Sequence, residues 1–193
     1  MRTYETHELV IKNMICSRCL KVVRQDLEEL GVEVLELRLG KLKIRFPKEE
    51  LTLQQIKTEL EKDDFEFAGD KDEVLTEEIK LVLVEMINKL PIVLSQKLSG
   101  FLAEKLHRDY WTLSKTFSKV EGITLEQYFI LLRVEKAKEL IDYNEMNFSE
   151  IAYELGYSNI NHLSGQFKRV TGMSMSAYKK LKDKPRKPFD KIV

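Results

Sequence analysis

The sequence predicts an α+β fold, in which a small strand-and-helix unit precedes a unit made only of helices. Three observations lead to this prediction. Over residues 1–70, short strand-like stretches alternate with helical patterns. Beyond them apolar residues recur at helical spacing, and one pattern of core residues is repeated about fifty positions later.

The first unit reads as strand, helix, strand, strand, helix and strand. In the second of these strands the alternation changes phase at Val34–Leu35, which predicts a β-bulge. Thr52 and Gln55 have the spacing of a capping box at the start of the second helix. The order predicts a ferredoxin-like βαββαβ sandwich. The elements are expected over Leu9–Ile11, Leu20–Leu30, Val32–Leu39, Leu42–Phe46, Leu53–Leu60 and Phe65–Phe67.

The second unit is expected to begin with a helix over residues 73–90. Its apolar stripe covers about half of the helix circumference, so more than one face is predicted to be buried. No linker rich in Gly, Ser or Pro precedes it, and Gly69–Asp72 is the only break. We therefore expect stiff coupling between the two units.

The repeated pattern predicts one supersecondary unit built twice. Each copy reads as a short helix, a tight turn and a second helix, which is the order of a helix-turn-helix. Between the copies, Thr124 and Gln127 begin a long helix that would hold them at a fixed spacing. The recurring residues are Leu113, Phe117, Gly122 and Tyr128 in the first copy and Leu163, Phe167, Gly172 and Tyr178 in the second.

The second copy has the clearer local signals. Asn147 and Glu150 form a capping box, and Gly156 is expected in a left-handed conformation just after the helix. Ser158 or Asn159 would cap the helix that follows. The side chains expected to face inward are Leu113, Phe117 and Val120 in the first copy and Leu163, Phe167 and Val170 in the second.

Residues 102–180 resemble the two-part DNA-binding domain of AraC-type bacterial transcription regulators. The similarity is strongest over Ile151–Ser158 and continues through His162–Ser164 to Gly172, and residues 76–90 match the leading helix of the family. The resemblance implies that the second helix of each copy enters one of two successive major-groove segments of double-stranded DNA.

The predicted DNA-binding residues lie on the outward faces of these two recognition helices. A competing interpretation is that the outward side chains are only solvated, and that Trp111 packs on the linking helix. The duplicated architecture favours DNA contact. Gly165 stands where family members often carry arginine, so that contact is expected to be lost. The predicted set is Trp111, Ser114, Lys115 and Ser118 in the first copy and Asn159, Ile160, Asn161, Ser164, Gly165, Lys168 and Arg169 in the second.

The charge distribution agrees with this prediction. The chain carries 32 basic and 32 acidic residues, but residues 1–75 have a balance of −4 and the remainder +4. We divide the chain into a first domain over 1–70, a DNA-binding domain over 71–182 and a basic tail over 183–193. The tail could neutralise DNA phosphates, or it could be a solvated terminus, which Pro185 and Pro188 favour.

Two cysteines mark the loop after the first strand. Met14, Cys16 and Cys19 have the Met-x-Cys-x-x-Cys spacing, and residues 7–68 resemble the heavy-metal-associated domains of copper chaperones and metal-pumping ATPases. In that family both cysteines hold a soft ion and the methionine anchors the loop. Asn13 departs from the usual glycine. Thiolates at a helix start are stabilised by its dipole, and two thiolates favour an ion such as Cu(I).

Three interpretations of Cys16 and Cys19 stay open: a metal site, a thiol–disulfide switch, or an inert remnant of a metal-binding ancestor. Structural zinc usually needs four ligands, and the three histidines lie on separate predicted elements. In a homodimer one soft ion could be shared by two cysteine pairs.

The sequence thus predicts a sequence-specific DNA-binding transcription regulator, responsive to a soft metal ion or to thiol redox state. The alternative is a metallochaperone whose helical half docks a protein partner. No Ser/His/Asp grouping or phosphate-binding glycine loop suggests an enzyme. With no signal peptide and no apolar stretch long enough to span a membrane, a cytoplasmic protein without a membrane partner is expected.

Overall fold

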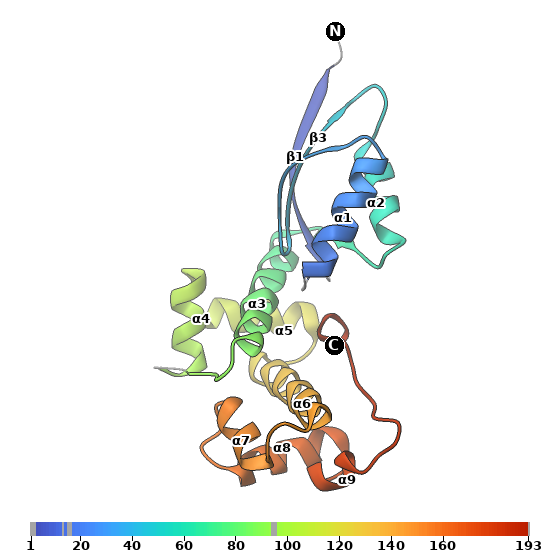
Figure 1. Ribbon diagram of the computed structural model, residues 1–193. Helices are drawn as coiled ribbons and strands as arrows, with labels where there is room; N and C mark the ends of the chain where they lie inside the picture. Colours follow the sequence, from blue (N-terminus) through green and yellow to red (C-terminus); the bar gives the residue numbers. More distant parts are fainter. Residues whose placement is uncertain (1–2, 13, 15–16, 94–95, 193) are drawn as a thin grey trace. The chain divides into compact units, whose positions relative to one another are not determined.

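The computed structural model describes residues 3–12, 14, 17–93 and 96–192. The chain forms two compact units, Met1–Leu81 and Val82–Val193. The division falls within helix α3, Lys71–Asn88 (Figure 1). Asp70 begins this helix, because its carboxylate accepts hydrogen bonds from the backbone N–H groups of Asp72 and Glu73. None of the helices in these ranges is both long and apolar enough to cross a lipid bilayer.

The first unit has the predicted βαββαβ succession. Its strands form one antiparallel sheet in the order β2-β3-β1-β4, and α1 and α2 lie side by side against it (Figure 1). Its assignment to the ferredoxin-like class stays a prediction. The elements are β1 Tyr4–Lys12, α1 Ser17–Glu29, β2 Glu33–Arg38, β3 Lys41–Pro47, α2 Leu53–Glu61 and β4 Glu66–Phe67.

The first strand is longer than the sequence suggested. We expected Leu9–Ile11, but β1 begins at Tyr4 and pairs with β3 from Tyr4↔Pro47 to Val10↔Lys41. Polar residues hid the alternation in its first half, where the backbone ladder rather than apolar side chains holds the strand. The predicted bulge is confirmed, since the register of β2 against β3 shifts between Val34 and Glu36.

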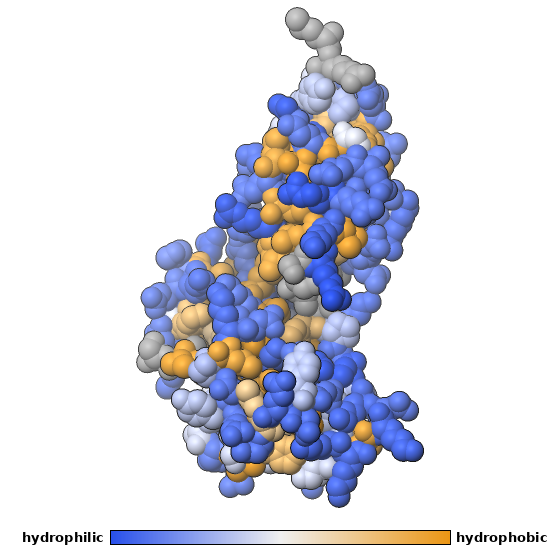
Figure 2. All heavy atoms as spheres, in the orientation of Figure 1, coloured by the Kyte–Doolittle hydropathy of each residue, from blue (hydrophilic) through white to orange (hydrophobic). Residues whose placement is uncertain are grey.

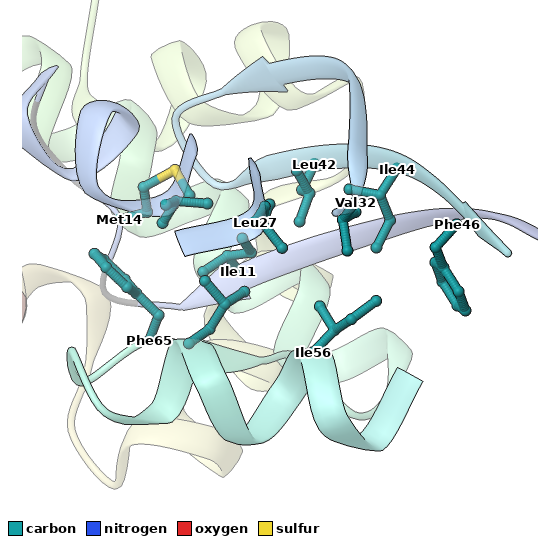
Figure 3. Close-up of a cluster of buried hydrophobic side chains, with 11 residues drawn as sticks. Ile11, Met14, Leu27, Val32, Leu42, Ile44, Phe46, Ile56 and Phe65 are labelled. Atoms are coloured by element: carbon teal, nitrogen blue, oxygen red, sulfur yellow. The ribbon is translucent and has the colours of Figure 1, made fainter. Parts of the chain in front are cut away.

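The core of the first unit lies between the sheet and its two helices. Val23 and Leu27 of α1 and Ile56 and Leu60 of α2 are fully buried against strand residues such as Ile44. The capping box of Thr52 and Gln55 is present at the start of α2. Figure 3 shows part of the cluster, with Met14 and Phe65 at one end and Phe46 at the other.

Between residues 96 and 180 the second unit is helical, as predicted. Asp109, Thr124, Asn147, Asn159 and Ser174 cap the starts of five of its helices through their side chains. The chain after α9 ends in a short 3-10 helix, Phe189–Lys191. The helices are α4 Leu98–Leu106, α5 Tyr110–Glu121, α6 Leu125–Tyr143, α7 Phe148–Glu154, α8 Ile160–Thr171 and α9 Met175–Lys179.

Candidate nucleic-acid interface

The two predicted copies of the helix-turn-helix share the same internal packing. Leu113 and Phe117 of α5 are fully buried, as are Leu163 and Phe167 of α8. The ring centroid of Phe117 lies 5.2 Å from that of Tyr128, and the equivalent pair Phe167 and Tyr178 lies at 5.5 Å. The duplication read from the sequence is therefore a duplication of core contacts. α4–α5 and α7–α8 are the two helix pairs, and α6 connects them.

The ends of the recognition helices repeat as well. Gly122 follows α5 with φ 72°, and Gly172 follows α8 with φ 77°, a left-handed conformation that glycine adopts without strain. Val120 and Val170 are a correction to the predicted inward faces, because they are 37 % and 38 % exposed. Each lies in the last turn of its helix, where the chain departs and only partly covers the side chain.

Gly156 sets the turn between α7 and α8. It has φ 70°, as expected for the residue after a helix. A Cβ atom there would also stand 2.9 Å from the carbonyl oxygen of Ile92, whose N–H donates to the Glu154 carbonyl at 2.7 Å. This close approach was not predicted, since nothing local to Gly156 indicates that residues 91–93 pass beside the turn.

Asn159 begins the second recognition helix. Its side-chain oxygen accepts from the N–H groups of Asn161 and His162 at 2.9 and 3.2 Å. Of the two caps proposed, Asn159 therefore fills that position, whereas the Ser158 hydroxyl lies 3.0 Å from Nδ1 of His162.

In the first copy, the predicted DNA-binding side chains stand at the surface of α5. Trp111 is 68 % exposed, so it does not pack on the linking helix as the competing interpretation had it. Lys115 Nζ lies 4.7 Å from the centre of the Trp111 ring, a cation–π contact on the outward face. Ser114 and Ser118 are half-buried beside them.

The base of α5 is fixed by Tyr110. Its hydroxyl donates a hydrogen bond to the carboxylate of Glu126 in α6. Burial and this carboxylate raise the pKa of Tyr110 far above its ordinary value, so the hydroxyl stays a donor at neutral pH. The same bond lowers the pKa of Glu126. The contact ties the first recognition helix to the connecting helix.

In the second copy, the predicted residues line the outward face of α8. Ile160 and Ser164 are half-buried, and the other members of the set are exposed. Gly165 has open space, since a Cβ there would meet nothing within 4 Å. Figure 2 shows mostly hydrophilic residues on the visible surface of the part that carries α7, α8 and α9. The exposed members are Asn159, Asn161, Gly165, Lys168 and Arg169.

Arg133 of α6 is a neighbour of this face that sequence reasoning missed. Its guanidinium carbon lies 4.6 Å from the centre of the Phe129 ring and 4.2 Å from that of Tyr157. It lines a cleft with Asn161 and Arg169. In the sequence, Arg133 is one of several cations on a long predicted helix, and only the tertiary structure brings it beside α8.

The basic tail does not present all of its cations to solvent. Arg186 pairs with Glu135 and Glu139 of α6, and Lys184 Nζ lies 3.0 Å from Asp142 Oδ1. The Glu135 side chain is only 3 % exposed, and its hydrogen bond raises the pKa of Arg186 despite the opposing effect of burial. These two cations hold the tail on α6, so they are not available to neutralise DNA phosphates.

The cysteine motif is only partly described by the structure. Cys16 lies outside the described residues, while Cys19 is half-buried in the first turns of α1. Met14 is 1 % exposed and lies within the core of the first unit. Among the described residues, no three His, Cys, Asp or Glu side chains gather as metal ligands. The metal site at Cys16 and Cys19 stays a prediction.

The helical unit is similar to known proteins. Residues 102–181 match the family model of a helix-turn-helix domain. The transcriptional activator RhaS of Escherichia coli O139:H28 is 34 % identical over 68 residues, which are 35 % of this chain and 24 % of RhaS. The aligned part thus spans about a quarter of the length of the curated relatives.

Solved structures of regulator domains are also similar. The C-terminal domain of the response regulator yesN from Fusobacterium nucleatum is 30 % identical, with a TM-score of 0.47 over 54 % of this chain and 96 % of that one. The DNA-binding domain of AdpA, solved with a target DNA, is 25 % identical, with a TM-score of 0.45 over 54 % and 88 %. Residues 102–181 of this chain therefore match a helix-turn-helix domain, and 68 residues of the chain are similar to the RhaS transcriptional activators.

Proposed function

We propose that this chain is a sequence-specific DNA-binding transcription regulator. In this proposal α5 and α8 enter two successive major-groove segments of one duplex. The observation that carries it is the pair of recognition helices, each anchored by the same buried leucine and phenylalanine and each exposing a polar or basic face. The RhaS relatives, which are transcriptional activators, support the same function.

The outward side chains suit base and phosphate contact. Asn161 can form paired hydrogen bonds with adenine, and Arg169 with guanine or a phosphate. Lys115 above the Trp111 ring offers a cation beside a planar surface. Base contacts would give sequence preference, while the cations would add affinity that falls with salt.

Selection of bound fragments from random duplex DNA tests this function. We expect an enriched motif with two parts, one for each recognition helix. Asn161→Ala should relax one part and Trp111→Ala the other, each weakening binding to the selected duplex by about tenfold or more. Lys57→Gln, on α2 of the first unit, is the control. No enriched motif, or equal loss with Lys57→Gln, would remove the proposal.

The first unit would make this regulator responsive to a soft metal ion or to thiol oxidation. Cys16 and Cys19 would supply two thiolates, and Cys19 lies near the start of α1, where the helix dipole favours negative charge. A Cu(I)-like ion accepts two sulfur ligands, whereas hard cations do not favour them. The exposed cations Arg18, Lys21 and Arg24 on the same helix add to this preference.

A homodimer would couple this site to DNA binding. One ion held by the cysteine pairs of two first units would set the spacing of two DNA-binding domains. Operator affinity measured with and without Cu(I), in the reduced protein and in the Cys16→Ser, Cys19→Ser variant, tests the coupling. We expect Cu(I) to change affinity or stoichiometry only in the unsubstituted protein. An identical response in both would reject the metal proposal and leave DNA binding intact.

A further inference from the structure

A basic cleft beside the second recognition helix overlaps the predicted DNA-binding face and extends beyond it to α6. It has a volume of about 540 Å³ and is lined from α6, from the α7–α8 turn and from α8. None of its lining residues is acidic, and two are arginines. A cleft with this charge would take an anion. The residues that carry the argument are Arg133, Tyr157, Asn161, His162, Gln166 and Arg169.

The Arg133 guanidinium lies against two aromatic rings. Phe129, one helical turn earlier on α6, and Tyr157, in the α7–α8 turn, both lie within 5 Å of it. The Tyr157 hydroxyl donates to Oε1 of Gln166 at 2.5 Å, which fixes that ring against α8. A cation held in this way loses little conformational freedom when an anion arrives.

Arg133 also has no anionic partner within the part of the chain that the structure describes. Its Nε atom is buried and has no hydrogen-bond partner there, and burial lowers the pKa of the guanidinium. Arg186 forms a contrast in the same unit, because it pairs with Glu135 and Glu139. A partly buried cation without a counter-ion is costly, and an anion entering the cleft would offset that cost.

We propose that the cleft is a phosphate-binding site in which Arg133 is the principal donor and the DNA backbone supplies the phosphate. The inference rests on the proposed function and extends it to a residue outside both recognition helices. Asn161 and Arg169 belong both to the cleft and to the predicted DNA-binding face. A phosphate of the strand that flanks the groove would thus fix the position of α8, a helix whose own face is weakened by Gly165.

Substitution of Arg133 with methionine separates phosphate binding from folding. Methionine keeps an apolar stem against the two rings and removes an unpaired charge, so Arg133→Met should unfold at the same or a higher urea concentration than the unsubstituted protein. Binding to the selected duplex should weaken about eightfold at 0.1 M salt. The slope of log K against log salt should fall by about 0.9, the value of one phosphate contact. Arg133→Lys keeps the charge and should retain the slope.

The control is Arg38→Met, at an exposed arginine of β2, which should change neither affinity nor slope. A second experiment uses inorganic pyrophosphate as the ligand and measures its protection of the protein against thermal unfolding, as a rise in melting temperature. An unchanged duplex affinity and slope in Arg133→Met, together with unchanged pyrophosphate protection, would overturn the site. Lost protection with unchanged duplex binding would support the site and overturn DNA as its phosphate source. A third outcome is that the unsubstituted protein binds no duplex, while pyrophosphate protects it but not the Arg133→Met variant. In that case the proposed function fails and the site stands.

Discussion

Substitution of Gly156 with alanine tests how the second helix-turn-helix is built. The residue has φ 70°, and a left-handed backbone costs an L-residue roughly 1 kcal/mol or more. The added Cβ would stand 2.9 Å from the Ile92 carbonyl oxygen, closer than real Cβ contacts come. Relief of this clash would displace Ile92 and weaken its hydrogen bond to Glu154, for roughly 1 kcal/mol more. We expect the free energy of unfolding to fall by about 2–3 kcal/mol.

Gly172→Ala is the matched control for this prediction. Gly172 has φ 77° but nothing within 4 Å of its added Cβ, so only the backbone cost of roughly 1 kcal/mol applies. Urea unfolding of both variants, followed by far-ultraviolet circular dichroism, measures the difference as a shift of midpoint at constant slope. If Gly156→Ala is no less stable than Gly172→Ala, the close approach of Ile92 does not restrain the turn.

Three further outcomes follow from single sites. Gly165→Arg should raise the free energy of unfolding by about 0.8 kcal/mol through helix propensity and should also tighten DNA binding. Gly165→Ala should raise the free energy of unfolding alone. If duplex titrations give the same affinity for both variants, the assignment of α8 as a recognition helix is refuted. Glu135→Gln should lower the free energy of unfolding by about 2 kcal/mol in urea titrations, because it leaves Arg186 without its most buried partner. Burial, with the Asp63 carboxylate, raises the pKa of Asp26 above its ordinary 3.8. The protonated carboxyl of Asp26 therefore stabilises the folded state below about pH 3.8, and this stabilisation is lost as the pH rises through the pKa that Asp26 has in the folded state. Asp26→Asn should therefore raise the melting temperature at neutral pH and leave it unchanged at about pH 3.

Local sequence patterns predicted the order of the helices and strands and much of the proposed interface. The capping boxes at Thr52, Thr124 and Asn147 and the bulge beside Val34 were all readable, because the groups that interact lie within a few residues of one another. The repeat of buried leucine and phenylalanine was readable for a similar reason, since helical periodicity places them on one face.

Other features were misread because local pattern was a poor guide. Val120 and Val170 continue the apolar period but lie in last turns, where the chain leaves the helix. The first half of β1 lacks apolar alternation, and its pairing with β3 determines its extent. The end of the helix decided the outcome for the two valines, and the position of β3 decided it for β1.

The sequence by itself determined the order of helices and strands, the duplication of the helix-turn-helix and the outward faces of its two recognition helices. Only the tertiary structure decided the surroundings of particular charges and turns. Arg133 lies against two rings beside α8, Arg186 reaches Glu135 across 51 residues, and the carbonyl of Ile92 lies close to Gly156. The physical reason is the range of the interactions. Caps, turns and helical faces are set by neighbours a few residues away, whereas these contacts depend on the path of the whole chain.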